Sequence, residues 1–210
     1  MITLLELEEN KRAYRRPLIP ELYEHLPGRN QGRFGRPGDA LNIIFLGHES
    51  LACAVLESAG WTKLPLTFAA CVKESLKELL RGEDLTRFPP MNRYNFHGRS
   101  QDMNWVRVIK PLEARHHFRL WRTGIKDERG RTLWWGSGNL DLTMRWIDFS
   151  HRPDPDMNLE RDYLAETLRG SPHVQEMRLA HLPGIPLKGV NDKGYPFFTD
   201  GRALIIELNS

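Results

Sequence analysis

The sequence lacks several features that would place it in a familiar class. It has only two cysteines in 210 residues, and no apolar run approaches the length of a membrane span, about 18 residues. Its start, MITLLELEEN, is acidic where a signal peptide would be basic. The net charge is only +3, too small to indicate nucleic-acid binding without a local basic stripe. We therefore expect a cytoplasmic protein and no nucleic-acid partner.

Specific catalytic signatures are also missing. The chain contains no HExxH, no CxxC pair, no GxSxG and no P-loop. What it does contain is a composition typical of a folded protein, with 40% hydrophobic and 27% charged residues. The length favours one domain with an extension over two equal domains.

The chain divides into an N-terminal extension over residues 1–40 and a globular domain over residues 41–210. The extension shows no period and contains PLIPELYEHLPGRNQGRFGRPGD, so we expect an extended arm that wraps the domain or a partner. The domain opens with ALNIIFLG, which predicts a buried strand. Two helices follow and end at Gly60 and Gly82. The apolar stripe of the second, which runs through Phe68, Val72 and Leu76 to Leu79 or Leu80, predicts core packing.

From Asn92 the period changes toward two. RYNFHGRSQDMNWVRVI, ARHHFRLWRT and RTLWWGSGNLDLT predict an antiparallel hairpin or meander. A third helix, NLERDYLAETLRG, and two strands, VQEMRLA and RALIIELN, complete the chain. The expected fold class is α+β: a single domain with a mostly antiparallel sheet packed by about three helices, plus the extended N-terminal arm.

The stretch RHHFRLWRT, residues 115–123, combines strand-like alternation with two histidines and three arginines. Because side chains alternate across a strand, Phe118 and Leu120 mark one face as the core side. His117, Arg119, Trp121 and Thr123 then line up on the opposite face. A row of imidazole, guanidinium and indole suits an anion such as phosphate or carboxylate. The alternative is a solvated sheet face with cross-strand ion pairs.

A second polar cluster, SHRPDPDMNLERD, precedes the third helix and continues into its first turns. Its members are His151, Asp154, Asp156, Glu160 and Asp162. Carboxylates at this place cap free backbone N–H groups. Alternatively, His151 with Asp154 or Asp156 supplies divalent-metal ligands or an acid/base pair. Asp141, just past the WWGSGNL strand, can orient a neighbouring histidine or serve as a turn residue.

Taken together, these segments resemble the LssY carboxyl-terminal domain family. The resemblance rests on LNIIFLG, AGW, HGRSQD, RHHFRLWRT, WWGSGNLD, SHRPDPDMNLERD and FFTDG, in this order from about Leu41 to about Leu208. It implies a bacterial origin and an association with the cell envelope, because such domains often follow membrane regions. It implies no particular reaction.

The family pattern falls on the polar residues of these motifs. With it we take His117, Asp141 and His151 as catalytic candidates, and Asp154 and Asp156 as candidate metal ligands. The candidate ligand-binding residues are Arg99, His116, Arg119, Trp121, Trp135 and Arg161. Where the family tends to carry a second histidine after His151, this chain has Arg152, which weakens the metal hypothesis.

Two functions compete at this point. In the first, the polar residues form a pocket that binds a phosphate-bearing envelope metabolite or lipid head group. If the protein is an enzyme, it is then a phosphoester hydrolase with a histidine as general acid/base. In the second, the same residues form a structural network in a non-catalytic scaffold for a membrane-protein partner. A location at the inner membrane surface is compatible with both. A shared site requires His117 and His151 to lie within about 12 Å.

Overall fold

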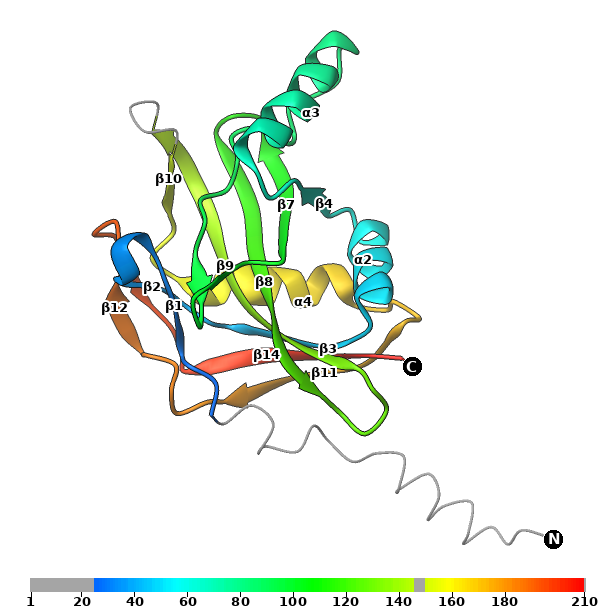
Figure 1. The fold of residues 1–210 in the computed structure, drawn as a ribbon, viewed down its shortest axis with the longest axis vertical. Helices are drawn as coiled ribbons and strands as arrows, with labels where there is room; N and C mark the ends of the chain where they lie inside the picture. Colours follow the sequence, from blue (N-terminus) through cyan, green and yellow to red (C-terminus); the bar gives the residue numbers. More distant parts are fainter. Residues whose placement is uncertain (1–24, 146–149, 210) are drawn as a thin grey trace, which may run out of the picture.

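The computed structural model describes residues 25–145 and 150–209, and in these ranges it contains three α-helices and one large sheet (Figure 1). The large sheet has eight strands. Their order is β11 (Val174–His181), β14 (Arg202–Leu208), β3 (Ile43–Gly47), β9 (Thr132–Arg145), β8 (Ala114–Lys126), β7 (Met103–Lys110) and β4 (Thr62–Leu64), with β10 (Ser150–Pro153) paired to β9. Of these pairs, β14 with β3 is parallel and the rest are antiparallel. The expected α+β domain with a mostly antiparallel sheet is confirmed.

The centre of the sheet is the meander β7–β8–β9, as the period of two predicts. Phe118 in the middle of β8 lies opposite Trp105 on β7 and Gly138 on β9. The turn between β8 and β9 is closed by Asp127, whose side chain accepts hydrogen bonds from the backbone N–H groups of Arg129 and Arg131. Strand β8 lies between β7 and β9 in the sheet. Its side chains therefore point into layers that cover the two faces of the sheet.

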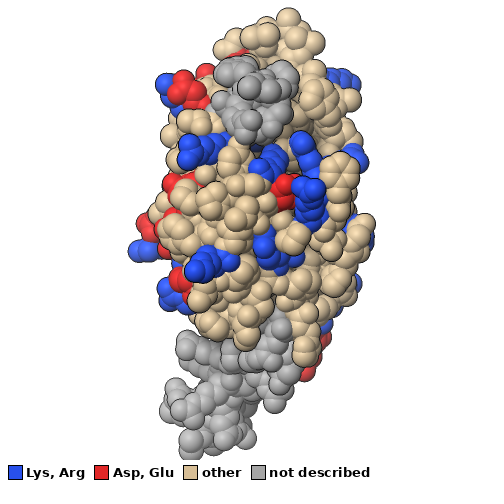
Figure 2. Space-filling model, turned by 90° about the vertical axis from the view of Figure 1, so that its left-hand side faces the viewer, with Lys and Arg blue, Asp and Glu red and all other residues tan. Residues whose placement is uncertain are grey.

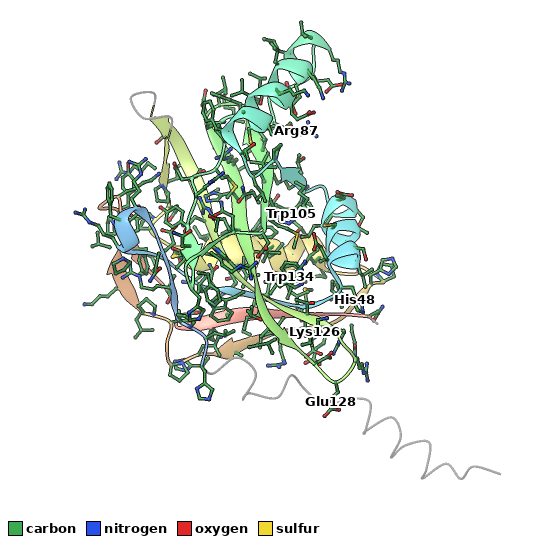
Figure 3. The ribbon with its side chains drawn as sticks, in the orientation of Figure 1. His48, Arg87, Trp105, Lys126, Glu128 and Trp134 are labelled. Atoms are coloured by element: carbon green, nitrogen blue, oxygen red, sulfur yellow. The ribbon has the colours of Figure 1, made fainter. Side chains whose placement is uncertain are left out.

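Helices α2 (Glu49–Ser58) and α4 (Met157–Leu168) cover one face of the large sheet, and their apolar residues share one cluster with Phe118. Trp105 and Trp134 also belong to this layer, in the interior of the molecule (Figure 3). Two glycines of β9 allow close packing here. A Cβ on Gly138 would lie 2.9 Å from Cγ of Glu160 on α4, and one on Gly136 would lie 2.8 Å from a Leu120 methyl. The GSG of WWGSGNL is therefore a packing requirement.

The other face of the large sheet carries a second apolar cluster, which includes Trp121 and Trp135. A small sheet lies over it, in the order β2 (Pro37–Ala40), β1 (Arg29–Gln31), β5 (Asn95–Phe96) and β6 (Arg99–Ser100). The hairpin β12 (Lys188–Val190) and β13 (Pro196–Phe198) forms a further two-stranded sheet, and a short 3-10 turn, η2 (Arg33–Gly35), joins β1 to β2. Residues 29–40 of the expected N-terminal extension thus supply two strands of this layer.

Helix α3 (Phe68–Leu80) contradicts the expectation of core packing for its apolar stripe. Phe68 is 65% exposed and Leu80 is 78% exposed, and Val72, Leu76 and Leu79 are exposed as well. The buried residues of α3 are Cys71, Ser75 and Glu78. The Glu78 carboxylate accepts hydrogen bonds from Thr86 and Arg87, and Arg87 lies below the helix in Figure 3. Because α3 projects beyond the end of the sheet (Figure 1), no apolar layer formed by residues 25–145 or 150–209 lies opposite its stripe.

Candidate functional site

Strand β8 divides the residues of RHHFRLWRT between the two faces of the sheet. Phe118 and Leu120 belong to the cluster under the helices, whereas Arg115, His117 and Arg119 line a pocket on the opposite side. This division is the one that the alternation predicts. The polar face is not solvated, however, because Arg115, His117 and Arg119 are all buried.

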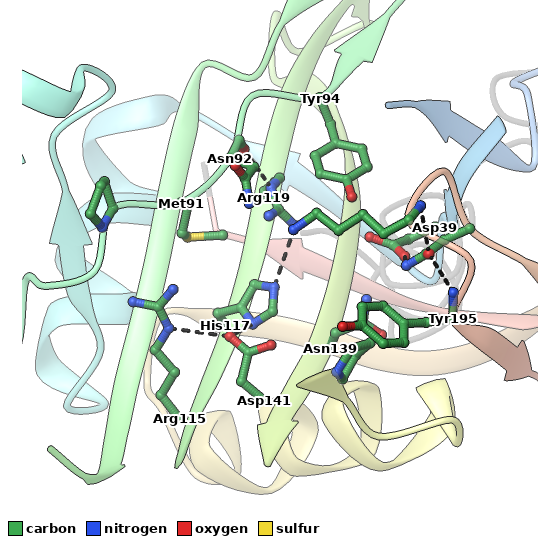
Figure 4. A pocket seen from close by; sticks show the side chains of 14 residues that line it. Asp39, Met91, Asn92, Tyr94, Arg115, His117, Arg119, Asn139, Asp141 and Tyr195 are labelled. Carbon is green, nitrogen blue, oxygen red and sulfur yellow. Dashed lines mark hydrogen bonds and ion pairs between the residues drawn. The ribbon is translucent and has the colours of Figure 1, made fainter. Parts of the chain in front are cut away.

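Cross-strand pairing brings Asp141 of β9 to this row (Figure 4). The register sets Arg115 opposite Asp141 and His117 opposite Asn139. Arg115 Nε donates to Asp141 Oδ2 at 3.3 Å, and Arg115 Nη1 donates to the carbonyl of Pro89 at 2.6 Å. His117 Nδ1 lies 3.2 Å from the same Asp141 oxygen, a close contact that is not aligned as a hydrogen bond. Asp141 therefore lies where it can orient the imidazole, as proposed from the sequence.

His117 is neutral at pH 7 in this setting. Burial lowers the pKa of His117; the charge of Asp141 opposes this shift, and the charges of Arg119 and Arg115 add to it. The other ring nitrogen, Nε2, lies 3.4 Å from Arg119 Nη1. These contacts suit the tautomer with its proton on Nδ1, which leaves Nε2 as an acceptor toward Arg119. The neutral imidazole therefore presents a lone pair on Nε2 at the pocket wall.

Arg119 is held by the chain that leads into β5. Its guanidinium lies over the ring of Tyr94, 4.7 Å from the centroid, and its Nε donates to the carbonyl of Asn92 at 3.3 Å. The Tyr94 hydroxyl donates to Asp192 at 2.7 Å. Burial raises the pKa of Tyr94, so this hydroxyl stays protonated. Stacking and hydrogen bonding thus fix a planar set of donors at the pocket wall.

The facing wall is a turn with the sequence NDKGY, residues 191–195. The side-chain oxygen of Asn191 accepts hydrogen bonds from the backbone N–H groups of Lys193 and Tyr195, and its amide donates to Asp39 at 3.0 Å. This turn places Lys193 at the pocket. Burial lowers the pKa of Lys193, and the charge of Arg119 lowers it further against the opposing effect of Asp39. Two cations therefore repel each other across this pocket.

The resulting pocket is open to solvent. It is lined by Asp39, Pro90, Met91, Asn92, Tyr94, Arg115, His117, Arg119, Asn139, Asp141, Pro153, Asn191, Lys193 and Tyr195. Three cationic and two acidic side chains leave an excess of positive charge. Figure 2 views the side of the molecule that carries β1, β2 and β12, where Lys and Arg side chains gather around an acidic one.

Five of the six expected ligand-binding residues do not line this pocket: Arg99, His116, Trp121, Trp135 and Arg161. Trp121 and Trp135 lie in the apolar cluster on this side of the sheet, and Trp135 Nε1 donates to the carbonyl of Pro27 at 2.9 Å. Arg99 on β6 is exposed and pairs with Asp102 at 3.2 Å. In the folded chain the two tryptophans therefore serve packing, and Arg99 forms an ion pair at the surface.

Arg161 lies on α4 and connects this helix to the FFTDG turn. Its guanidinium donates to both carboxylate oxygens of Asp200, at 2.6 and 3.1 Å. Partial burial alone would raise the pKa of Asp200, but hydrogen bonds from Arg161 and Arg202 hold that pKa below its ordinary value. Arg161 is buried and forms a structural fork here, away from the pocket.

His116 points to the opposite side of β8 from His117 and meets Glu160 of α4. His116 Nδ1 and Glu160 Oε2 are 2.7 Å apart, and the imidazole stacks on Tyr163 with 3.5 Å between ring centroids. Burial raises the pKa of Glu160, and the charge of Asp141 adds to the shift. Burial lowers the pKa of His116 to about 4, helped by Arg107 and His117. At neutral pH His116 is therefore uncharged, and Glu160 holds its proton more tightly than a solvated carboxyl group does.

The backbone of His151 lies in β10 opposite Met144, and its side chain is outside the described residues. Met144 follows Asn139, the partner of His117, by five positions along β9. At roughly 3.4 Å per residue, the two pairing positions are about 17 Å apart along the sheet. The strand register does not bring the two backbones together, and a site shared by both histidines stays a prediction.

Asp154 and Asp156 make the capping contacts that their position suggests. Asp154 Oδ1 accepts from the backbone N–H of Asp156 at 2.8 Å, and Asp156 Oδ1 accepts from that of Asn158 at 2.9 Å at the start of α4. Within the described ranges, no group of three or more His, Cys, Asp or Glu side chains could hold a metal ion. Metal binding by these two carboxylates stays a prediction.

Several pocket residues were not among the candidates taken from the sequence. Arg115 and Asn139 could have been predicted from strand alternation, because each lies two positions from a candidate on the same strand face. Lys193 and Tyr195 could not, since they belong to a turn in a loop far along the chain. Asp39 lies in the segment expected to be an arm.

A family model described as the LssY C-terminus matches residues 23–203, so the chain belongs to this family. The match starts well before Leu41, so β1, β2 and Asp39 are part of the family domain. No curated protein and no solved structure matches the chain. In the described ranges, no helix combines the length and apolar character needed to cross a membrane.

Proposed function

We propose that the pocket between β8, the Tyr94 segment and the 191–195 turn binds a small phosphate-bearing ligand. The observation that carries this proposal is that Arg119 and Lys193 line the same partly buried pocket, where the charge of Arg119 lowers the pKa of Lys193. Like charges at such a place are stabilised when an anion lies between them. Without an anion, their repulsion opposes the folded arrangement.

The surrounding groups suit a phosphate ester better than a bare apolar ligand. Arg119 offers planar donors held against Tyr94, and Asn139 adds a neutral amide to the lining. The charge of Arg115 is already balanced by Asp141, and Asp39 offsets part of the remaining positive charge. Arg119 and Lys193 together therefore supply the net attraction.

The same geometry supplies a base if the ligand is hydrolysed. His117 is neutral at pH 7, contacts Asp141 through Nδ1 and presents Nε2 to Arg119 and the pocket. No Ser, Thr or Cys is among the described lining residues, so the imidazole would activate water directly. Hydrolysis is measured as release of inorganic phosphate from glycerol phosphate. We expect this release to be lost in His117→Gln.

Isothermal titration with inorganic phosphate and with glycerol phosphate tests the binding proposal. Arg119→Gln should weaken binding by about tenfold to a hundredfold, because a hydrogen bond to a charged group is lost. Arg99→Gln is the matched control, since Arg99 is an exposed arginine outside the pocket. Equal losses in both variants, or no heat with the wild-type protein, would refute the proposal.

A structural network is the second candidate function, and the pairing of Arg115 with Asp141 and of Arg161 with Asp200 favours it. In that case the polar residues fix the fold for a scaffold role. Wild-type protein would then give no heat with either phosphate compound. Arg119→Gln would lower the melting temperature strongly, whereas Arg99→Gln would not.

A further inference from the structure

The turn between β1 and β2 carries Phe34, whose side chain is 95% exposed, more than any other large apolar residue in the described ranges. Its backbone is left-handed, with φ 58° and ψ 27°. The turn is closed by the Gly32 N–H on the Arg36 carbonyl at 2.8 Å and by the Arg36 N–H on the Arg33 carbonyl at 3.1 Å. An apolar ring is thus presented to solvent by an ordered turn.

This turn is fastened to the rim of the pocket. The Arg33 N–H donates to Asp192 at 3.0 Å, and the other oxygen of Asp192 accepts from the hydroxyl of Tyr94, a lining residue. Gly32 packs so closely that an added Cβ would lie 2.1 Å from Cγ of Asp192. Lys193, the next residue, lines the pocket. Phe34 therefore lies on a turn that contacts Asp192, the residue before Lys193 of the pocket lining.

Basic and apolar side chains surround Phe34 on this turn and on the neighbouring strand. Arg33 and Arg36 flank Phe34, and the stretch QGRFGRP contains no acidic residue. On the neighbouring strand β12, Lys188 is exposed and Val190 is 55% exposed. Arg29 Nη2 donates to the Val190 carbonyl at 2.7 Å, which joins β12 to β1. Aromatic rings prefer the boundary between lipid chains and head groups, and Lys and Arg are attracted to anionic lipid surfaces.

We infer that the phosphate bound by the pocket belongs to a phospholipid in an anionic membrane surface, with Phe34 inserted at the head-group boundary beside it. This inference rests on the proposed function, because it assigns the source of the phosphate. A soluble phosphate ester would need Arg119 and Lys193 but would gain nothing from Phe34. A lipid gains from both, since the cationic rim and the exposed ring contact the same surface as the head group.

Flotation of the full chain with vesicles tests this assignment. The vesicles contain phosphatidylglycerol with phosphatidylcholine, and pure phosphatidylcholine vesicles serve as the neutral comparison. Phe34→Asn keeps the left-handed turn, because asparagine adopts this backbone readily. We expect about tenfold weaker binding to the anionic vesicles, from the lost insertion of one aromatic ring. Phe68→Asn is the control, because Phe68 is an exposed phenylalanine on α3, away from the rim.

Titration of the same variants with glycerol phosphate separates the two proposals. We expect Phe34→Asn to bind glycerol phosphate as the wild type does. If glycerol phosphate binds but Phe34→Asn floats like the wild type, or the wild type does not float, the lipid assignment is overturned and the pocket function stands. If Phe68→Asn loses flotation instead, a different surface docks and the assignment is also overturned. If the wild type does not bind glycerol phosphate, both proposals fall.

Discussion

Strand β8 and helix α3 both carry a regular apolar pattern, yet the pattern identifies the core-facing side correctly in β8 and wrongly in α3. In β8, Phe118 and Leu120 pack under the helices as expected. In α3, the stripe from Phe68 to Leu80 is exposed and the side with Glu78 is buried. Periodicity states which side chains share a face, but the neighbouring elements decide which face is covered.

The two regions differ in their position in the fold. β8 is a central strand with layers on both sides, so even its polar face is buried, and Arg115, His117 and Asp141 must satisfy one another. Helix α3 leaves the body of the molecule (Figure 1), and its inner contact is the ion pair of Glu78 with Arg87. The polar face of β8 is buried, and the apolar face of α3 is exposed, because of these positions in the fold.

The largest expected effect is on the helix side of β8. Phe118 is fully buried, and its ring lies 4.8 Å from that of Trp61 and 6.4 Å from that of Phe45. Phe118→Ala should lower the free energy of unfolding by about 3–5 kcal/mol, because it removes apolar contacts and leaves a cavity. Urea denaturation measures the change. A loss near zero would show that β8 does not carry the core.

An intermediate effect on the free energy of unfolding is expected at Glu160, the carboxyl group beside His116, and it depends on pH. Burial raises the folded-state pKa of Glu160, so the folded state holds the proton more tightly than the unfolded chain. The stabilisation is complete below the unfolded pKa of about 4.5 and is lost as pH rises toward the folded pKa. Glu160→Gln removes this loss and keeps an oxygen near His116. Its stability relative to wild type should rise with pH above 4.5, by up to roughly 1 kcal/mol per pH unit.

Denaturation of both proteins at pH 5 and at pH 8 checks this expectation. The matched control is Glu113→Gln, since Glu113 is exposed and pairs with Lys110 at 2.7 Å. A difference between Glu160→Gln and wild type that does not change with pH would contradict a raised pKa of Glu160 in the folded protein.

The smallest effect is expected on α3. Leu80→Ser should change the free energy of unfolding by no more than about 0.5 kcal/mol, because Leu80 is 78% exposed and its removal opens no cavity. The same urea experiment measures it. A loss comparable with that of Phe118→Ala would mean that the α3 stripe is covered in solution, and the contrast between the two regions would disappear.

Local patterns predicted most of the elements. The meander β7–β8–β9, the buried strand β3 and helix α4 follow from periodicity and from caps such as Asp156. The site was predicted in part: His117, Arg119 and Asp141 share one pocket, and Arg115 could have been added from the same alternation. Trp121, Trp135 and Arg161 were predicted from the same motifs but lie outside the pocket. The two tryptophans pack in an apolar cluster, and Arg161 forms an ion pair with Asp200.

The sequence by itself determined which side chains share a face of β8, because alternation along a strand is a local property of the backbone. It also determined the capping role of Asp154 and Asp156, whose partners lie two residues away. Tertiary structure alone decided that Lys193 and Asp39 meet Arg119 in one pocket, and that the apolar side of α3 faces outward. Such contacts join segments far apart in the chain, and no local period encodes which distant surface will cover a given face.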